Sequence, residues 1–197
     1  DNDLDLIVSS SSGNRLLVYR NDGTGKFTLT DTLPVGRSPM HVIAAHLNND
    51  PHLDLAVANW SGDSVSVLLG QGQGVFAPAV DYAVGRRPFS LVAADLDGDT
   101  HIDLATANTY SDDVTILINR KDGTFQAGPT LPGGDYPVSV SAADVDGDGK
   151  QDLMVANISY SSNACATIPQ CTPNAARQVW MYYNQGGAVF DAPMFLA

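Results

Sequence analysis

Residues 95–108 read Asp-Leu-Asp-Gly-Asp-Thr-His-Ile-Asp-Leu-Ala-Thr-Ala-Asn, and residues 144–157 read Asp-Val-Asp-Gly-Asp-Gly-Lys-Gln-Asp-Leu-Met-Val-Ala-Asn. The two stretches begin 49 residues apart, and each joins an aspartate-rich loop to a run of small and branched apolar residues. The apolar run has earlier copies in the same register, Asp54-Leu-Ala-Val-Ala-Asn and Asp5-Leu-Ile-Val. A unit that recurs at a fixed spacing of this length is typical of repeat proteins, whose units bury their apolar faces against one another.

The rest of each unit repeats as well. A second apolar run begins at residues 16, 65, 114 and 179, and 11 residues later comes a phenylalanine: Phe27, Phe76, Phe125 and Phe190. Gly-x-x-Pro connectors end at Pro39, Pro88 and Pro137 and lead into Val-Ala-Ala-type segments. Each complete unit therefore predicts four short strands joined by tight turns, which is the composition of one β-propeller blade.

We accordingly expect an all-β chain of four-stranded antiparallel blades, with units at residues 1–36, 37–85, 86–134 and 135–197. The first unit lacks its first strand, and the other three are complete. A β-solenoid or a sandwich is the alternative architecture. Because a propeller must close to hide its edge strands, we expect this region to be part of a larger propeller or to be completed by another chain, rather than a closed four-bladed ring.

Composition supports this fold and limits the partners. All 22 acidic residues are aspartate, with 18 glycines and 11 prolines, and this is turn chemistry rather than helix chemistry. The net charge of −12 opposes binding to nucleic acid or to anionic lipid and favours divalent cations. No apolar stretch is long enough for a membrane span.

The aspartate loops predict calcium sites. Ca²⁺ takes six to eight oxygen ligands, and loop positions 1, 3, 5 and 9 can supply carboxylates while position 7 supplies its backbone carbonyl. In the third unit these positions are Asp95, Asp97, Asp99, His101 (carbonyl) and Asp103, and in the fourth they are Asp144, Asp146, Asp148, Lys150 (carbonyl) and Asp152. Without a cation the four carboxylates of each loop would repel one another strongly.

The two earlier loops depart from this pattern. The second loop has His46 at position 1 and no glycine after Asn48, and because calcium prefers oxygen to imidazole, metal binding and its absence are equally expected there. Its remaining oxygen donors are Asn48, Asp50 and Asp54. The first unit keeps only Asp1, Asp3 and Asp5, so it can bind metal only if the missing half is supplied.

The spacing, the aspartate loop and the Gly-x-Phe turn resemble the FG-GAP/VCBS repeat family across essentially the whole chain. This family includes integrin α-subunit propellers, fungal propeller lectins and many secreted bacterial proteins. The resemblance implies a seven-bladed or similar propeller, structural calcium in the loops between the first two strands, and a binding role. An EF-hand is excluded, because the flanking helices and the glutamate at position 12 are missing.

A partner surface is expected on the side of the units opposite the metal loops. In an antiparallel meander, turns between second and third strands lie on the same side as the connectors, and both contain aromatic and arginine residues, which are common in interface hot spots. The candidates are Trp60, Tyr110, Tyr160, Arg37, Arg86, Arg87 and Tyr136. Scattered surface residues or packing contacts are an equally good interpretation. An insertion at residues 158–178 carries Cys165 and Cys171, for which we expect a disulfide in an oxidising compartment rather than two free thiols.

The sequence thus predicts a calcium-stabilised extracellular module for adhesion or protein recognition, with no catalytic residues and with possible self-association. A carbohydrate-binding lectin is the alternative, and a non-catalytic segment of a larger secreted enzyme is a further one.

Overall fold

The computed structural model describes residues 3–158 and 178–196. In these ranges the chain forms β-strands and one 3-10 turn, with no α-helix and so none that could span a membrane. The strands of the four main sheets are, in order, β1 (Leu6–Ser10), β2 (Arg15–Asn21) and β3 (Phe27–Pro34); β4 (Pro39–Ala45), β5 (Asp54–Asn59), β6 (Ser64–Leu68) and β9 (Val80–Ala83); β10 (Pro88–Ala94), β11 (Asp103–Asn108), β12 (Asp113–Asn119) and β13 (Phe125–Pro132); β14 (Pro137–Ala143), β15 (Asp152–Asn157), β16 (Gln178–Tyr182) and β19 (Met194–Leu196).

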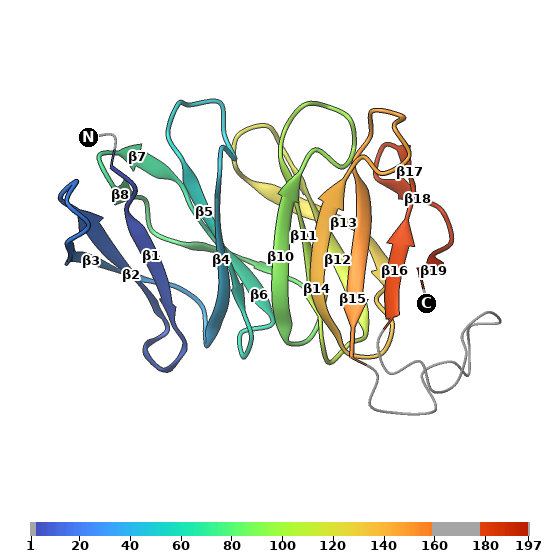
Figure 1. Cartoon of the computed structure of the whole chain (residues 1–197), viewed down its shortest axis with the longest axis horizontal. Helices are drawn as coiled ribbons and strands as arrows, with labels where there is room; N and C mark the ends of the chain where they lie inside the picture. The colour runs from blue at the N-terminus through green and yellow to red at the C-terminus, as the bar shows by residue number, and fades with distance from the viewer. Residues whose placement is uncertain (1–2, 159–177, 197) are drawn as a thin grey trace.

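Each main sheet is an antiparallel meander, and the four lie side by side along the long axis of the molecule (Figure 1). The first sheet has three strands with β1 at its edge, and the other three sheets have four strands each. In the second and fourth sheets small hairpins interrupt the meander, formed by β7 (Gly70–Gly72) with β8 (Val75–Phe76) and by β17 (Asn184–Gly186) with β18 (Val189–Phe190). The expected all-β architecture of antiparallel sheets is confirmed.

The 49-residue spacing reappears as strand register. Pro39 pairs with Asn59, Pro88 with Asn108 and Pro137 with Asn157, each followed by the same bulge. Every residue of β5 and β11 is buried, because both faces of these strands are covered by neighbouring sheets. This double burial explains why the second strand of each unit is a nearly continuous run of small and branched apolar residues.

The hydrophobic core consists of three clusters that lie between successive sheets. Leu16 and Val18 of the first sheet pack with Leu55 and Val57 of the second. The second and third sheets meet around Val65, Val67, Leu104, Leu117 and Phe125. The third and fourth meet around Val114, Ile116, Leu153, Val155 and Tyr182. Among the described residues, each core cluster draws on two successive sheets, so the sheets bury their apolar faces against one another.

The meander separates two kinds of loop. The β4–β5 and β10–β11 loops, which carry aspartates, lie along the upper edge in Figure 1, and the β5–β6 and β11–β12 turns lie along the lower edge. At the lower edge the connectors meet these turns, since the Trp60 N–H donates to the Ser38 carbonyl at 2.9 Å and the Thr109 N–H donates to the Arg87 carbonyl at 3.0 Å. The two candidate sites are therefore on opposite edges of the molecule.

Candidate functional site

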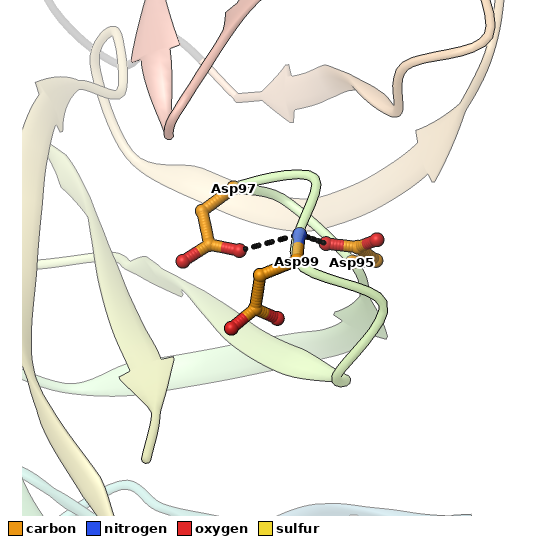
Figure 2. Close-up of side chains that lie close together, drawn as sticks. All are labelled: Asp95, Asp97 and Asp99. Carbon is orange, nitrogen blue, oxygen red and sulfur yellow. Dashed lines mark hydrogen bonds between the residues drawn. The ribbon is translucent and has the colours of Figure 1, made fainter. Parts of the chain in front are cut away.

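The β10–β11 loop gathers three of its carboxylates. Asp95, Asp97 and Asp99 each offer an oxygen within 4.8 Å of the others. Figure 2 shows the Asp99 amide nitrogen between the other two carboxylates, to which it donates at 3.2 Å (Asp95) and 3.0 Å (Asp97). Gly98, at φ 81°, makes the bend that the loop requires, with a backbone conformation that costs glycine little.

The carboxylates of this cluster repel one another. Burial raises the pKa of Asp97, a backbone hydrogen bond from Asp99 opposes the rise, and the charges of Asp99 and Asp95 add to it. Among the described residues, two basic side chains form ion pairs with this cluster, both with Asp99: Lys121 Nζ at 3.1 Å and, when protonated, His101 Nδ1 at 3.3 Å. A set of hard carboxylate oxygens at this spacing fits Ca²⁺, whose ligands are oxygens at about 2.3–2.6 Å.

Asp103 has a role that the sequence did not reveal. Its side chain is completely buried and accepts hydrogen bonds from the N–H groups of Leu96 (2.9 Å) and Asn119 (2.8 Å). Burial raises its pKa to about 6, although these two bonds favour the charged form. Asp103 lies outside the three-carboxylate cluster. It ties the loop to the end of β12, and its role as a calcium ligand stays a prediction.

The second and fourth sheets have the same link, and the first sheet has only its half at the end of β2. Asp54 accepts from Leu47 and Gly70, both at 2.7 Å. Asp152 accepts from Val145 and Asn184, both at 2.9 Å, and Asp5 accepts from Asn21 at 2.9 Å. This aspartate recurs in the first and second units, whose loops otherwise lack the metal pattern. That recurrence in the sequence could have indicated a structural role.

The β14–β15 loop forms a second cluster with different members. Asp144, Asp146 and Asp152 bring carboxylate oxygens within 4.8 Å of one another. Asp148 instead accepts from Lys150 Nζ at 2.5 Å, and this hydrogen bond lowers the pKa of Asp148. Lys150 was expected to contribute only its backbone carbonyl. Its side chain instead pairs with Asp148, the one carboxylate of the loop that lies outside the cluster. This loop also supplies an oxygen set that fits Ca²⁺.

The β4–β5 loop is satisfied by its own hydrogen bonds. His46 Nδ1 lies 2.9 Å from the His52 carbonyl oxygen, Asn48 bonds both the amide and the carboxylate of Asp50, and Asp50 accepts from the His52 N–H at 2.8 Å. Within residues 3–158 and 178–196, no cluster of three metal-ligating side chains occurs here. In the first unit, Asp3 and Asp5 are described, and Asp1 lies outside the described residues.

On the lower edge the structure brings together an aromatic–arginine surface, which we define as Trp60, Arg87, Phe89, Tyr110 and Tyr136. The Trp60 ring contacts Phe89 and Tyr110 edge to face, with ring centroids 5.7 Å apart in both pairs. The Arg87 guanidinium carbon lies 5.5 Å from the ring centroids of both Trp60 and Tyr110. Tyr136 completes the row, at 5.2 Å from Tyr110.

The remaining predicted surface residues lie around this row or beyond the described region. Arg37 Nη2 donates to the Ser61 carbonyl at 2.9 Å, and the side chain of Arg86 is exposed. Phe89 was not predicted, although its position after the connector proline gave a signal. Tyr160, Cys165 and Cys171 lie outside the described residues, so the expected disulfide stays a prediction.

Two residues of the aromatic–arginine surface have unusual backbone conformations. Arg87 and Tyr136 both have φ 58°, in the left-handed region that bulky residues rarely adopt. Each N–H is held by an aspartate of the preceding turn, with Asp63 accepting from Arg87 at 2.9 Å and Asp112 accepting from Tyr136 at 3.0 Å. Ser38 occupies the same position one unit earlier, with φ 54°, and donates to Asn14.

Comparison with known proteins agrees with this architecture. The model of the FG-GAP-like repeat matches three overlapping segments, residues 1–57, 46–106 and 95–155. No curated protein has a sequence similar enough to match the chain.

Solved structures share the fold at low sequence identity, and their propeller-like architecture agrees with the sheets described above. A functionally unknown protein of Desulfotomaculum acetoxidans is 15% identical, with a TM-score of 0.61 over 96% of this chain and 53% of its own. An Agrocybe aegerita lectin that recognises non-reducing terminal N-acetylglucosamine is 20% identical, with a TM-score of 0.58 over 92% and 46%. BBS1N, solved in complex with ARL6DN, is 17% identical, with a TM-score of 0.58 over 96% and 46%. The chain therefore spans about half the length of these solved chains.

Proposed function

The chain belongs to the FG-GAP-like repeat family, and from this premise we propose that it is a calcium-stabilised β-propeller module that recognises a protein partner outside the cell. The aspartate loops hold the metal, and the aromatic–arginine surface on the opposite edge meets the partner. The observation that carries the proposal is the pair of left-handed residues, Arg87 and Tyr136, in that surface.

Strained backbone is a pointer to function when an easier residue is available. Glycine adopts a φ of 58° at little cost, whereas a side chain there costs of order 1 kcal/mol. Both positions nevertheless carry large side chains that contact the ring of Tyr110, which is itself 46% exposed. These contacts hold the exposed surface in one arrangement despite the backbone cost, and we attribute that arrangement to recognition.

The packing of the rings favours a protein over a sugar. Carbohydrates stack on a free aromatic face, but the Trp60 ring faces Arg87 and meets Phe89 and Tyr110 edge to face. A preordered arrangement of rings and guanidinium is instead typical of protein interface hot spots. Carbohydrate binding is the second candidate, supported by the exposed Tyr110 and by the lectin among the structural neighbours.

Calcium is proposed as a structural ion in the β10–β11 and β14–β15 loops. Binding there would neutralise each group of carboxylates and hold the loop against the adjacent strands. Millimolar extracellular calcium suits a site that opens to solvent, and an extracellular setting also suits the expected Cys165–Cys171 disulfide.

The module is proposed to be non-catalytic, whether it acts alone or as a segment of a larger secreted enzyme. We also propose that the four sheets form part of a propeller that is completed by further repeats or by another chain.

Selection from a phage-displayed peptide library in calcium buffer, alongside a glycan array, tests the recognition proposal. We expect selected peptides to lose at least about tenfold in affinity, or about 1.4 kcal/mol, for Arg87→Gly and Tyr110→Ala. Ser38→Gly is the matched control, because it relieves the same backbone conformation outside the aromatic–arginine surface. We expect Arg87→Gly to lower the melting temperature no more than Ser38→Gly does.

Peptide binding that survives both Arg87→Gly and Tyr110→Ala would overturn the proposal, as would the absence of any selected peptide. Glycan binding that is lost in Tyr110→Ala would establish the second candidate in its place.

A further inference from the structure

The three junctions between successive sheets share three equivalent positions. One lies near the end of the last strand of a sheet, and the other two are the end of the third strand of the next sheet and the recurring phenylalanine that follows it. Strand pairing and the spacing of the phenylalanines place the members of each set in the same register. In order along the chain the junctions have Leu33, Leu68 and Phe76; Tyr82, Leu117 and Phe125; and Leu131, Tyr182 and Phe190.

A tyrosine ring fills two of these junctions. Between the second and third sheets, Tyr82 contacts Phe125 edge to face, with ring centroids 5.5 Å apart. Between the third and fourth sheets the tyrosine comes from the following sheet, because Tyr182 is 1% exposed and its hydroxyl donates to the Pro132 carbonyl of the preceding sheet. Each of these two junctions therefore contains one phenol group, contributed from one side or the other.

The junction between the first and second sheets has leucine at both tyrosine positions. A pocket of about 510 Å³ lies there, and Leu33, Leu68 and Phe76 are all part of its wall. Every other residue that lines the pocket is apolar except Asp81. An apolar wall with few polar groups and a volume in this range is typical of small-molecule sites. The first junction thus has an open pocket at the positions where the other two junctions have a phenol ring.

Two groups of the wall can orient a ligand. Pro34 has the register of Pro132, so its carbonyl corresponds to the one that accepts the Tyr182 hydroxyl. The Asp81 carboxylate accepts the Ser66 hydroxyl at 2.5 Å, and within residues 3–158 and 178–196 no basic side chain forms an ion pair with it. A carboxylate without a cationic partner, in a chain of net charge −12, favours a cationic ligand.

We propose that this pocket binds a small phenol that carries a cationic amine. The ring takes the place that Tyr82 and Tyr182 occupy at the other junctions and contacts Phe76. The phenol hydroxyl donates to the Pro34 carbonyl, and the ammonium group pairs with Asp81. The pocket shares no residue with the calcium loops or with the aromatic–arginine surface, so this inference is independent of the function proposed above.

A chemical-shift titration of the ¹⁵N-labelled full chain in calcium buffer, with tyramine as the probe, tests the inference. We expect one saturable set of shifts, centred on Leu33, Leu68 and Asp81. p-Cresol, which lacks the amine, and phenethylamine, which lacks the hydroxyl, should each bind about two- to fivefold more weakly, because an exposed ion pair and a neutral hydrogen bond each contribute modestly. p-Hydroxyphenylacetate, which has a carboxylate in place of the amine, should bind more weakly than p-cresol.

The repeat supplies variants that fill the pocket without a foreign side chain. Leu33→Tyr copies Tyr82, and Leu68→Tyr copies Tyr182. Each should abolish tyramine binding without lowering the melting temperature, because the ring then comes from the chain itself. Leu29→Tyr is the matched control and should keep the binding, since Leu29 is 47% exposed in the same strand as Leu33 and does not line the pocket.

Asp81→Thr tests the cationic half of the proposal. Thr130 occupies the same position in the third sheet, so the variant keeps a hydroxyl beside Ser66 and removes the charge. It should bind tyramine and p-cresol equally well. The absence of saturable shifts up to roughly 10 mM tyramine would overturn the inference, as would binding that persists in folded Leu33→Tyr and Leu68→Tyr. Wild-type protein that binds p-hydroxyphenylacetate as tightly as tyramine would refute the role of Asp81.

Discussion

His46 Nδ1 lies 2.9 Å from the carbonyl oxygen of His52. Because a carbonyl can only accept, the imidazole donates its N–H at this contact. His46 and His52 occupy the first and seventh positions of the β4–β5 loop, where the β10–β11 loop has Asp95 and the carbonyl proposed to bind calcium. In the second sheet the imidazole thus contacts the carbonyl that the loop pattern would offer to a cation, so we expect the β4–β5 loop to hold its shape without metal.

A third calcium site should therefore appear when this histidine is removed. Combining His46→Asp with Asn49→Gly restores the first carboxylate and the glycine of the pattern, leaving Asn48, Asp50 and Asp54 as further oxygen donors. We expect calorimetric titration to rise from two calcium ions per chain in the wild type to three. Asn49→Gly alone is the control and should stay at two, and a double variant that also stays at two would contradict this account of the loop.

Chelation should lower the melting temperature. A metal that binds only the folded state adds about 2.7 kcal/mol per site at a hundredfold excess over its Kd, and each kcal/mol shifts the Tm of a domain of this size by roughly 2–4 °C. Differential scanning calorimetry with calcium and with EDTA measures the shift. Asp97→Asn should reduce it, whereas Asp50→Asn in the β4–β5 loop should leave it unchanged. Equal melting temperatures in the two buffers would argue against occupied sites.

Replacing Asp103 and replacing Asp97 should reduce stability with a different dependence on calcium. Asp103 accepts from two buried amides, so Asp103→Asn sets a donor against one of them and should cost about 1–3 kcal/mol with or without calcium. Asp97→Asn should cost stability only when calcium is present. Urea unfolding of both variants in calcium and in EDTA separates the two roles. A purely calcium-dependent loss for Asp103→Asn would show that its structural link is negligible.

Acid should weaken the junction between the second and third sheets. His41 Nδ1 accepts the Leu91 N–H at 3.1 Å, and burial lowers the pKa of His41 below its usual value of 6.5. As the pH falls, His41 therefore takes up a proton in the unfolded chain at a higher pH than in the folded chain. The contribution of neutral His41 to the free energy of unfolding is complete above pH 6.5 and is lost as the pH falls below it. Urea midpoints from pH 7 to pH 5 should show the decline.

His41→Ser is the matched variant, because Ser90 occupies the same position one unit later and accepts the Val140 N–H at 3.4 Å. The variant should reduce the slope of stability against pH in calcium buffer. An unchanged slope would mean that other groups cause the decline.

Much of the fold was predictable because its signal is local and repeated. Strand positions followed from apolar runs that recur every 49 residues, and the opposite placement of loops and connectors followed from the antiparallel meander. Asp103 was harder to interpret, since an aspartate that ends a metal-like loop looks the same in sequence whether it faces a cation or two amides. Burial and hydrogen-bond partners decide between these roles, and both depend on where β12 ends.

The sequence by itself determined the unit, its strands and the loops whose carboxylates can gather, because spacing and turn chemistry act over a few residues. Only the tertiary structure decided that His46 completes its own loop and that Arg87 lies between Trp60 and Tyr110. These relationships join residues whose distance in space is set by the packing of one sheet on the next, and local sequence patterns do not specify that distance.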